Sequence, residues 1–152
     1  MASVRDQVRS MCSKWLWLLL VPSWAVAGCS SVFGTDETRL PGVILFDSDE
    51  PVTVIPDTVE VGAEFTVSVE TAWPNGCARK GDTEVESASD HATVAPYDIV
   101  KDADGCTQLV KRSTHTAVVS LAQTGEAHVV VRGRAAPDVF DLVAFEYPVI
   151  VR

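Results

Sequence analysis

Three histidines are the first residues to examine for chemistry, because imidazole serves both as a metal ligand and as a general base. They are His91, His115 and His128, and none lies in a metal-ligand spacing such as H-E-x-x-H or C-x-x-C. His115 shares its alternation with the apolar Ala117 and Val119, which favours an inward position. His128 is out of step with its apolar neighbours and is expected to point outward. We therefore expect structural or solvated histidines.

Nucleophile motifs are equally scarce. Serines are plentiful, but none lies in a G-x-S-x-G or S-x-x-K pattern. The chain also has no glycine-rich phosphate loop. We predict no catalytic residues, no cofactor and no enzymatic activity.

The best metal candidate is the segment "KDADGC". Calcium loops use oxygen ligands at alternate positions before a turn glycine. With Gly105 as that glycine, Asp102 and Asp104 fall at ligand positions. The outer positions hold Val100 and Lys111, where carboxylates are required. A plain Asp-Gly turn is the simpler interpretation, and the two aspartates remain weak candidates.

The segment "TAWPNGC" contains Trp73, the one weak candidate for a binding residue. On an exposed loop, this tryptophan would be a binding anchor. Packed over a disulfide, it would be structural. Both interpretations are open, and the second is the simpler.

The N-terminal residues 1–28 have the three parts of a secretory signal: a basic start, an apolar centre and a small-residue cleavage site. The apolar centre, "WLWLLLVPSWAVA", is 13 residues long. A membrane-spanning helix needs about 20 residues, whereas a signal centre is typically shorter. We predict a signal peptide over 1–28, and ordinary cleavage after Ala27 stays open as an alternative.

The end of this signal, Val26-Ala27-Gly28-Cys29, resembles the lipobox of bacterial lipoproteins. The resemblance implies that the Cys29 thiol takes a diacylglyceryl group, that cleavage precedes it, and that its amino group is usually acylated, for example with palmitate. The cysteine count agrees with lipidation. Because Cys12 leaves with the signal, lipidation of Cys29 leaves a single pair of cysteines.

Two or more acyl chains hold a protein stably on a membrane. Ser30, which follows the cysteine, is not aspartate. In an envelope with two membranes, the resemblance therefore implies the outer membrane facing the periplasm. Otherwise it implies the extracellular face of the plasma membrane.

The remaining cysteines, Cys77 and Cys106, are predicted to form a disulfide, because export brings them into an oxidising compartment. The stretch between them is polar and contains glycine. It buries little apolar surface and most needs a covalent link. Two unpaired structural thiols are the alternative.

The exported chain is acidic. The whole sequence has a net charge of −9 from 12 basic and 21 acidic residues, and the signal removes three basic and one acidic, which leaves −11. This charge argues against nucleic acid binding, which needs clustered Lys and Arg. The acids are spread along the chain, so a solvated surface or attraction of cationic partners would explain them.

Residues 29–41 are polar without apolar periodicity, and we predict a flexible tether there. From 42 to 152 the apolar pattern has a period of two, as expected for strands. Prolines, glycines and aspartates separate runs of 5–8 residues. We predict an all-β domain with about seven or eight short strands in an antiparallel two-sheet sandwich.

Two phrases, "VEVGAEFTVSVET" and "LAQTGEAHVVVRG", resemble a loop-to-strand segment and a later hairpin of bacterial immunoglobulin-like domains. The resemblance spans residues 42–152 and implies an immunoglobulin-like sandwich. The sequence departs from antibody-type domains, because Ala127 stands where the tyrosine corner would fall. There is also no tryptophan between Cys77 and Cys106.

Two functional hypotheses follow. The first is a lipid-anchored, non-enzymatic envelope module that binds an unidentified envelope protein or glycan. The second is an acidic inhibitor of a cationic hydrolase such as lysozyme. A hydrolase is a third and weaker hypothesis, because the sequence shows no nucleophile-and-base constellation.

Overall fold

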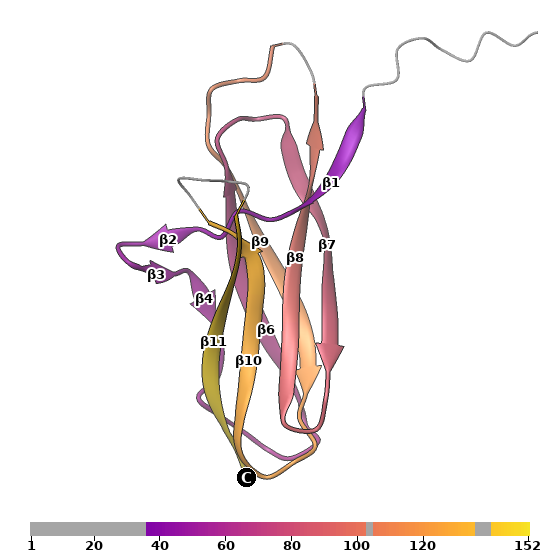
Figure 1. The fold of residues 1–152 in the computed structure, drawn as a ribbon, viewed down its shortest axis with the longest axis vertical. Helices are drawn as coiled ribbons and strands as arrows, with labels where there is room; N and C mark the ends of the chain where they lie inside the picture. The colour runs from indigo at the N-terminus through magenta and orange to yellow at the C-terminus, as the bar shows by residue number, and fades with distance from the viewer. Residues whose placement is uncertain (1–35, 103–104, 136–140) are drawn as a thin grey trace, which may run out of the picture. The chain divides into compact units, whose positions relative to one another are not determined.

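The computed structural model describes residues 36–102, 105–135 and 141–152, and all regular elements in them are β-strands (Figure 1). The predicted signal peptide 1–28 and the lipidation residue Cys29 lie outside the described residues. The strands are β1 (Glu37–Pro41), β2 (Phe46–Asp47), β3 (Glu50–Pro51), β4 (Thr53–Val54), β5 (Thr58–Val59), β6 (Glu64–Trp73), β7 (Ala78–Ser87), β8 (His91–Lys101), β9 (Lys111–Ser120), β10 (Gly125–Arg134) and β11 (Leu142–Val151).

The strands form two principal sheets around a common core. The first, sheet A, has the order β1-β8-β10-β11-β5, and β7 pairs with β8 as well. The second, sheet B, has the order β4-β6-β9, while β2 and β3 form a separate small ribbon. In the view of Figure 1, the long strands of sheet A lie in front of β6 and β9.

The segment after β1 links the two sheets through its backbone. The amide of Ile44 donates to the carbonyl oxygen of Arg134 in β10 at 2.8 Å, and the amide of Ala72 in β6 donates to Val43 at 2.8 Å. Gly42 lies where this segment passes the sheets. A Cβ atom there would come within 2.5 Å of a Thr71 methyl carbon. Only glycine fits this crossing without displacing its neighbours.

The alternation predicted for the long strands is confirmed. Most inward residues of β6, β8, β9, β10 and β11 are small or β-branched. The partly buried aromatic residues Phe65, Phe145 and Tyr147 pack against this core. The buried core consists of Ile44, Val59, Val67, Val69, Ala92, Val94, Ala117, Val119, Leu121, Ala127, Val129, Val131, Val149 and Val151.

The sheets are mixed, so the prediction of a purely antiparallel sandwich is wrong. Strand β10 runs parallel to β8, and β11 runs parallel to β5. The strand between β8 and β10 in the sequence, β9, pairs in the other sheet. When the chain leaves a sheet, forms one strand in the opposite sheet and then comes back, its two strands in the first sheet run in the same direction. Apolar alternation shows which residues face inward but not which sheet a strand joins.

Strand lengths and the start of the domain also differ from expectation. The six strands β6 to β11 have 10 or 11 residues each, longer than predicted. Residues 37–41, assigned to the tether, form β1 and pair with Tyr97–Lys101 of β8. This strand is half exposed and polar. Backbone pairing rather than apolar burial orders it, so its sequence shows no alternation.

Candidate binding groove

The outer face of sheet A is hollowed across β7, β8, β10 and β11. The hollow has a volume of about 560 Å³. It arises because the residues at its floor have short side chains, notably Thr93, Ala95 and Ala144, while longer side chains stand around them. The lining residues are Pro41, Glu84, Glu86, Thr93, Ala95, Tyr97, Arg132, Gly133, Leu142, Val143 and Ala144.

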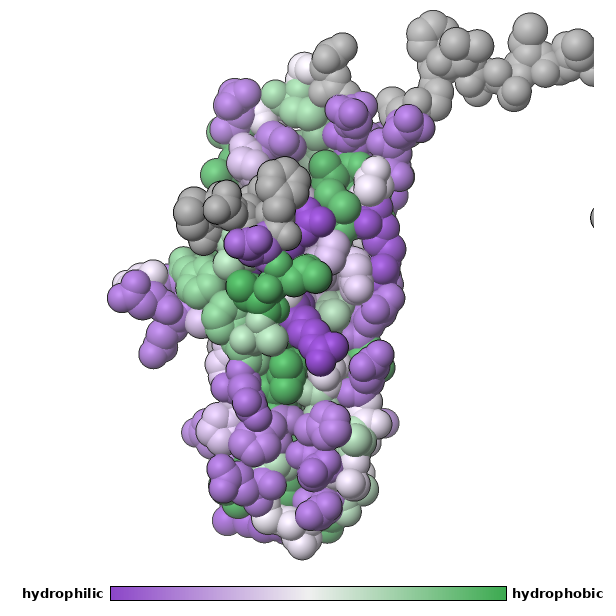
Figure 2. All heavy atoms as spheres, in the orientation of Figure 1, coloured by the Kyte–Doolittle hydropathy of each residue, from purple (hydrophilic) through white to green (hydrophobic). Residues whose placement is uncertain are grey.

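One side of this groove is apolar. Leu142, at the start of β11, is 73% exposed. Figure 2 shows an apolar area on this face over the upper parts of β10 and β11, whereas the end of the domain near the C-terminus is mostly hydrophilic. Exposed apolar surface beside a hollow is typical of binding sites.

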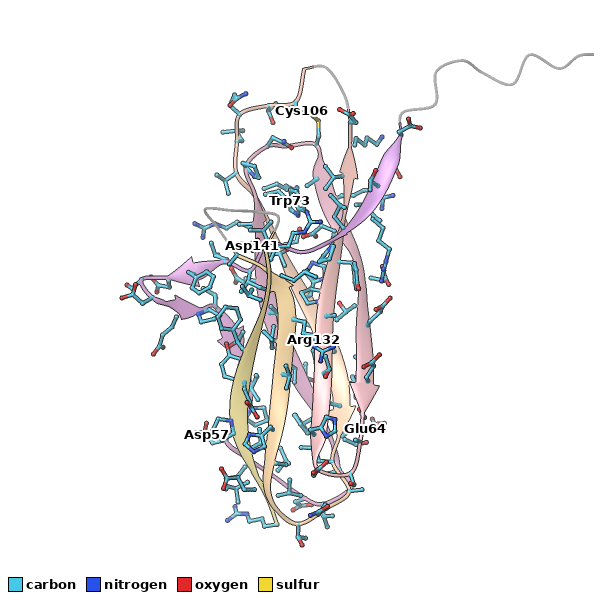
Figure 3. The ribbon with its side chains drawn as sticks, in the orientation of Figure 1. Asp57, Glu64, Trp73, Cys106, Arg132 and Asp141 are labelled. Atoms are coloured by element: carbon cyan, nitrogen blue, oxygen red, sulfur yellow. A yellow bond between two sulfur atoms is a disulfide. The ribbon has the colours of Figure 1, made fainter. Side chains whose placement is uncertain are left out.

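Arg132 is the cation of the groove, and Figure 3 shows it over the middle of sheet A. It is exposed and forms no ion pair with any described residue. Two positions along β10, Arg134 has a buried Nε without a hydrogen-bond partner among the described residues. Two guanidinium groups without carboxylate partners are unexpected in an acidic chain. Of the two, the Arg132 guanidinium is exposed and lines the groove, and it is available to an external anion.

The opposite side of the groove is acidic and belongs to β7. Glu86 is exposed and has no ion pair within the described part of the chain. Its register partner on β8 is Thr93, which in turn neighbours Val130 of β10. Because neighbouring strands lie about 4.8 Å apart, the acidic β7 side is roughly 10 Å from the Arg132 strand. The groove therefore presents opposite charges across a floor of small side chains.

A cluster around Arg39 of β1 borders this acidic side. The Arg39 guanidinium donates to both carboxylate oxygens of Asp82 at 2.8 Å and to Glu84 at 2.6 Å. It also lies 3.3 Å from the ring centroid of Tyr97, a cation–π contact. Hydrogen bonding to Arg39 lowers the pKa of Asp82, and the pKa of Arg39 is raised by Asp82. This cluster joins β1 to β7 across β8.

Beneath the outer face, a polar cluster lies between the sheets. Asp98 of β8 and His115 of β9 have fully buried side chains, and the imidazole Nε2 donates to Asp98 Oδ1 at 3.1 Å. The indole Nε1 of Trp73 donates to Asp98 Oδ2 at 2.8 Å. Because a carboxylate only accepts, His115 carries its proton on Nε2. In the neutral imidazole, Nδ1 then accepts from the Thr83 hydroxyl, 3.3 Å away.

The environment of Asp98 favours its charged form. Burial by itself would raise the pKa of Asp98, but hydrogen bonds from His115, Thr71 and Trp73 outweigh burial and hold the pKa below its ordinary value. An ionised carboxylate is therefore kept inside the domain by donors on two strands, β6 and β9. Gly42 passes close by, since a Cβ atom there would lie 3.1 Å from Asp98 Oδ2.

The chain Thr83–His115–Asp98 contains the residue types of an acyl-transfer triad. In such a triad, the hydroxyl and the imidazole must both reach the substrate. The imidazole of His115 is fully buried, and its two nitrogens are directed at Thr83 and Asp98. The arrangement satisfies polar groups inside the domain, and it offers no position for a substrate beside the imidazole.

Trp73 is only 7% exposed, which excludes the exposed binding anchor and agrees with the structural interpretation of this residue. Its indole packs with Val43 and Ala78 and supplies a hydrogen bond to Asp98. Tryptophan buries a large apolar area while its N–H finds a polar partner. The residue therefore stabilises the domain from within.

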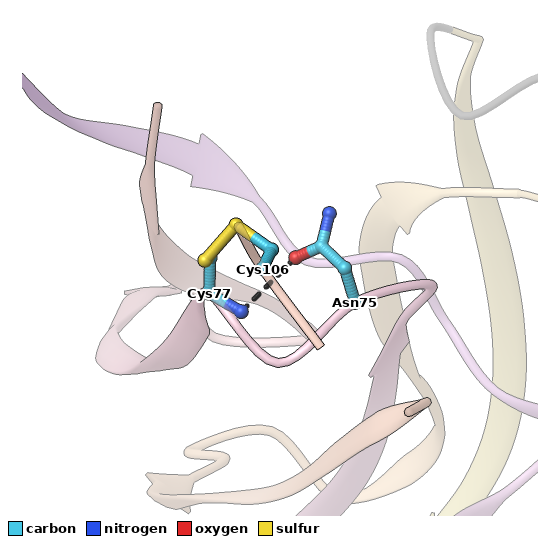
Figure 4. Close-up of a disulfide and its surroundings, with 3 residues drawn as sticks. All are labelled: Asn75, Cys77 and Cys106. Carbon is cyan, nitrogen blue, oxygen red and sulfur yellow. Dashed lines mark hydrogen bonds between the residues drawn. A yellow bond between two sulfur atoms is a disulfide. The ribbon is translucent and has the colours of Figure 1, made fainter. Parts of the chain in front are cut away.

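The predicted disulfide is confirmed. Cys77 and Cys106 are bonded, with their Cα atoms 5.4 Å apart (Figure 4). The side chain of Asn75 accepts a hydrogen bond from the Cys77 amide at 3.1 Å and shapes the turn before the bond. The bond ties the segment after β8 to the start of β7.

The metal candidates find no structural support. Asp102 is exposed, and Asp104 lies outside the described residues. In the part of the chain that the structure describes, no three acidic, histidine or cysteine side chains are placed to hold a metal ion. The Nδ1 atom of His91 lies 2.9 Å from Asp90 Oδ1, and the Nδ1 atom of His128 lies 3.1 Å from Glu146 Oε1.

Sequence reasoning missed both Arg132 and Asp98. Asp98 shares its alternation with the apolar Ala92 and Val94, and this parity is a signal for a buried carboxylate. His115 gave the matching signal on β9. Arg132 alternates with the inward Val131 like any surface residue, so no sequence pattern distinguishes it.

Comparisons of the chain with models of known protein families, with curated proteins and with solved structures yielded no match.

Proposed function

We propose that this chain is a lipid-anchored, non-enzymatic binding module of a bacterial cell envelope. The N-terminal signal and the lipobox-like Val26–Cys29 support the anchor. In the described residues no helix has the length and hydropathy to cross a bilayer. We also propose that the domain belongs to the immunoglobulin-like sandwiches, which the antiparallel pairs β6–β9 and β10–β11 support.

The groove on sheet A is the binding site of this proposal. The observation that carries it is the exposed Arg132 without an ion pair, facing Glu86 across a floor of small side chains. A ligand that fits has a carboxylate for Arg132, a cation for Glu86 and a thin backbone between them. An extended peptide segment with charges of both signs has this chemistry, and an apolar side chain of it would rest against Leu142.

A binding array of peptides and envelope glycans, probed with the exported full-length chain, tests the proposal. Arg132→Gln should weaken binding of carboxylate-bearing peptides at least tenfold, because a hydrogen bond to a charged group contributes about 1.5–3 kcal/mol. Arg112→Gln is the matched control, since Arg112 is exposed on β9 and has no ion pair with a described residue. Equal affinities of the two variants would rule out the groove.

The anchor is tested separately. Cys29→Ala should move the protein from the membrane fraction to the soluble fraction, because the thiol that accepts the lipid is lost. Metabolic labelling with an alkyne palmitate analogue should mark only the wild type. Equal labelling of both proteins would contradict lipidation at Cys29.

The second candidate function, inhibition of a cationic hydrolase, is supported by the exposed acids Asp82, Glu84 and Glu86, which share the outer face of β7. Titration of the chain into lysozyme distinguishes it from the first. Stoichiometric loss of lysozyme activity, reduced by Glu86→Gln, would support an inhibitor, and unchanged activity would leave the peptide-binding module.

A further inference from the structure

The last two residues of the loop between β8 and β9 are apolar and exposed. Leu109 is 73% exposed and Val110 is 61% exposed. Of the strongly exposed large apolar residues in the described chain, these are the only two that are adjacent in sequence. The Cys77–Cys106 disulfide and a backbone hydrogen bond from Gly76 to Thr107 hold the loop in place. Two apolar side chains are thus presented together by a covalently tied loop.

The chain enters the domain beside this loop. The amide of Asp102 donates to the carbonyl oxygen of Asp36 at 3.2 Å, and Glu37 is the register partner of Lys101. A hollow beside the loop is lined by Thr38 and Leu40 of β1 together with Cys106. Figure 1 places the loop and the start of β1 at one end of the domain, opposite the C-terminus.

Only a short length of chain separates this end from the proposed lipid. From Cys29 to Asp36 is seven residues, which reach at most about 25 Å when fully extended. As a flexible coil they span roughly 15 Å. A lipid at Cys29 therefore keeps the loop end, and not the C-terminal end, near the bilayer.

We propose that Leu109 and Val110 insert into the bilayer interface when Cys29 is lipidated, so that the domain has a fixed membrane-facing end. This inference rests on the proposed lipid anchor. Apolar side chains gain from burial at the interface, and Lys111 and Arg112 follow them with no ion pair among the described residues.

The charges around the loop indicate which lipids matter. Asp36 and Asp102 are exposed at the same end and oppose attraction of Lys111 and Arg112 to anionic headgroups. Glu37 is already paired with Arg79 and Lys101. Apolar contact therefore dominates, and insertion should occur in zwitterionic phosphatidylcholine as well.

Tryptophan fluorescence of the processed, lipidated full chain tests this inference in phosphatidylcholine vesicles containing brominated acyl chains. The processed wild type retains only Trp73, which is buried. In Leu109→Trp, the added emission should shift to shorter wavelength and lose at least half its intensity to bromine quenching. The matched control is Val61→Trp, 47% exposed, whose amide donates to Arg152 at the C-terminal end. It should be neither shifted nor quenched.

Vesicle sedimentation separates the possible failures. Sedimentation with the vesicles without quenching of Trp at position 109 would overturn the insertion of Leu109 and Val110 and leave the anchor intact. A blue shift without quenching would indicate burial against protein and would also overturn it. A wild type that does not sediment would overturn both the anchor and the inference. Circular dichroism matching the wild type verifies that each variant is folded.

Discussion

Two regions of this domain hold the sheets together by different means. Around Val67, Val119 and Val129, the buried side chains between the sheets are aliphatic, with a few partly buried aromatic residues packed against them. Around Asp98 and His115, the same space contains an ionised carboxylate and the hydrogen-bond donors that surround it. Both regions are fully buried, yet their tolerance to change should differ.

The comparison shows that burial alone does not predict how much a substitution destabilises the domain. Truncation of an aliphatic side chain in the valine region loses only the burial free energy of the deleted atoms and leaves a small cavity. Removal of one partner from the polar region leaves another buried polar group without a hydrogen bond, which costs much more than the bond contributed. The stability of the polar region therefore depends on each of its hydrogen-bonding side chains.

The largest effect is expected for Asp98→Ala. The substitution leaves the Nε2–H of His115 and the indole N–H of Trp73 without acceptors inside the domain. Each buried donor left without an acceptor costs about 1–3 kcal/mol, and two such donors remain. Urea unfolding of the exported protein, followed by circular dichroism, measures this loss. A loss below that of a single valine truncation would contradict the comparison.

The next largest effect is expected for removal of the Cys77–Cys106 disulfide. The loop from Cys77 to Cys106 has 30 residues counting both ends, because the sequence separation is 29. The chain-entropy model gives about 3.6 kcal/mol for such a loop. The double variant Cys77→Ser/Cys106→Ser should lose roughly 2–4 kcal/mol in unfolding free energy. Reduction of the wild type should reproduce that loss, and disagreement between the two would indicate an effect of the serines themselves.

Val129→Ala is the matched test in the aliphatic region. Removing two buried carbon atoms costs roughly 2 kcal/mol, including the cavity. The same urea titration measures it. If Val129→Ala destabilises as much as Asp98→Ala, the polar network has no special role.

The smallest effect is the acid dependence of stability. Because the pKa of Asp98 is lowered by folding, its contribution is fully present above about pH 4 and is lost as the pH falls through the folded pKa. The stability difference between wild type and Asp98→Asn should shrink from pH 6 to pH 2. Asp82→Asn is the control, because its carboxylate is exposed and screened by solvent. Parallel curves for wild type and Asp98→Asn would refute the assignment.

Much of the fold follows from local patterns. The inward parity of Val67 and Val69, and of Val129 and Val131, follows directly from alternation, because successive side chains of a strand point to opposite faces. The pairing of Cys77 with Cys106 also follows from the cysteine count, because these two remain once Cys12 and Cys29 are assigned to the signal and the lipid. The candidate site does not, because its charges come from Arg132 and Glu86 on strands that are distant in sequence.

The sequence by itself determined which residues are buried in the long strands and that Cys77 and Cys106 pair. It also carries the signal and the lipobox-like motif on which the proposed anchor depends. These properties depend on the period of a strand and on the chemistry of single residues, both of which are local.

Only the tertiary structure decided the parallel neighbours of β10 and β11, the strand β1 within the expected tether and the grouping of Asp98 with His115 and Trp73. Each depends on backbone or side-chain hydrogen bonds between segments far apart in the chain. Such partners are chosen by the packing of two sheets. No local pattern records that choice, because the same alternation satisfies either sheet.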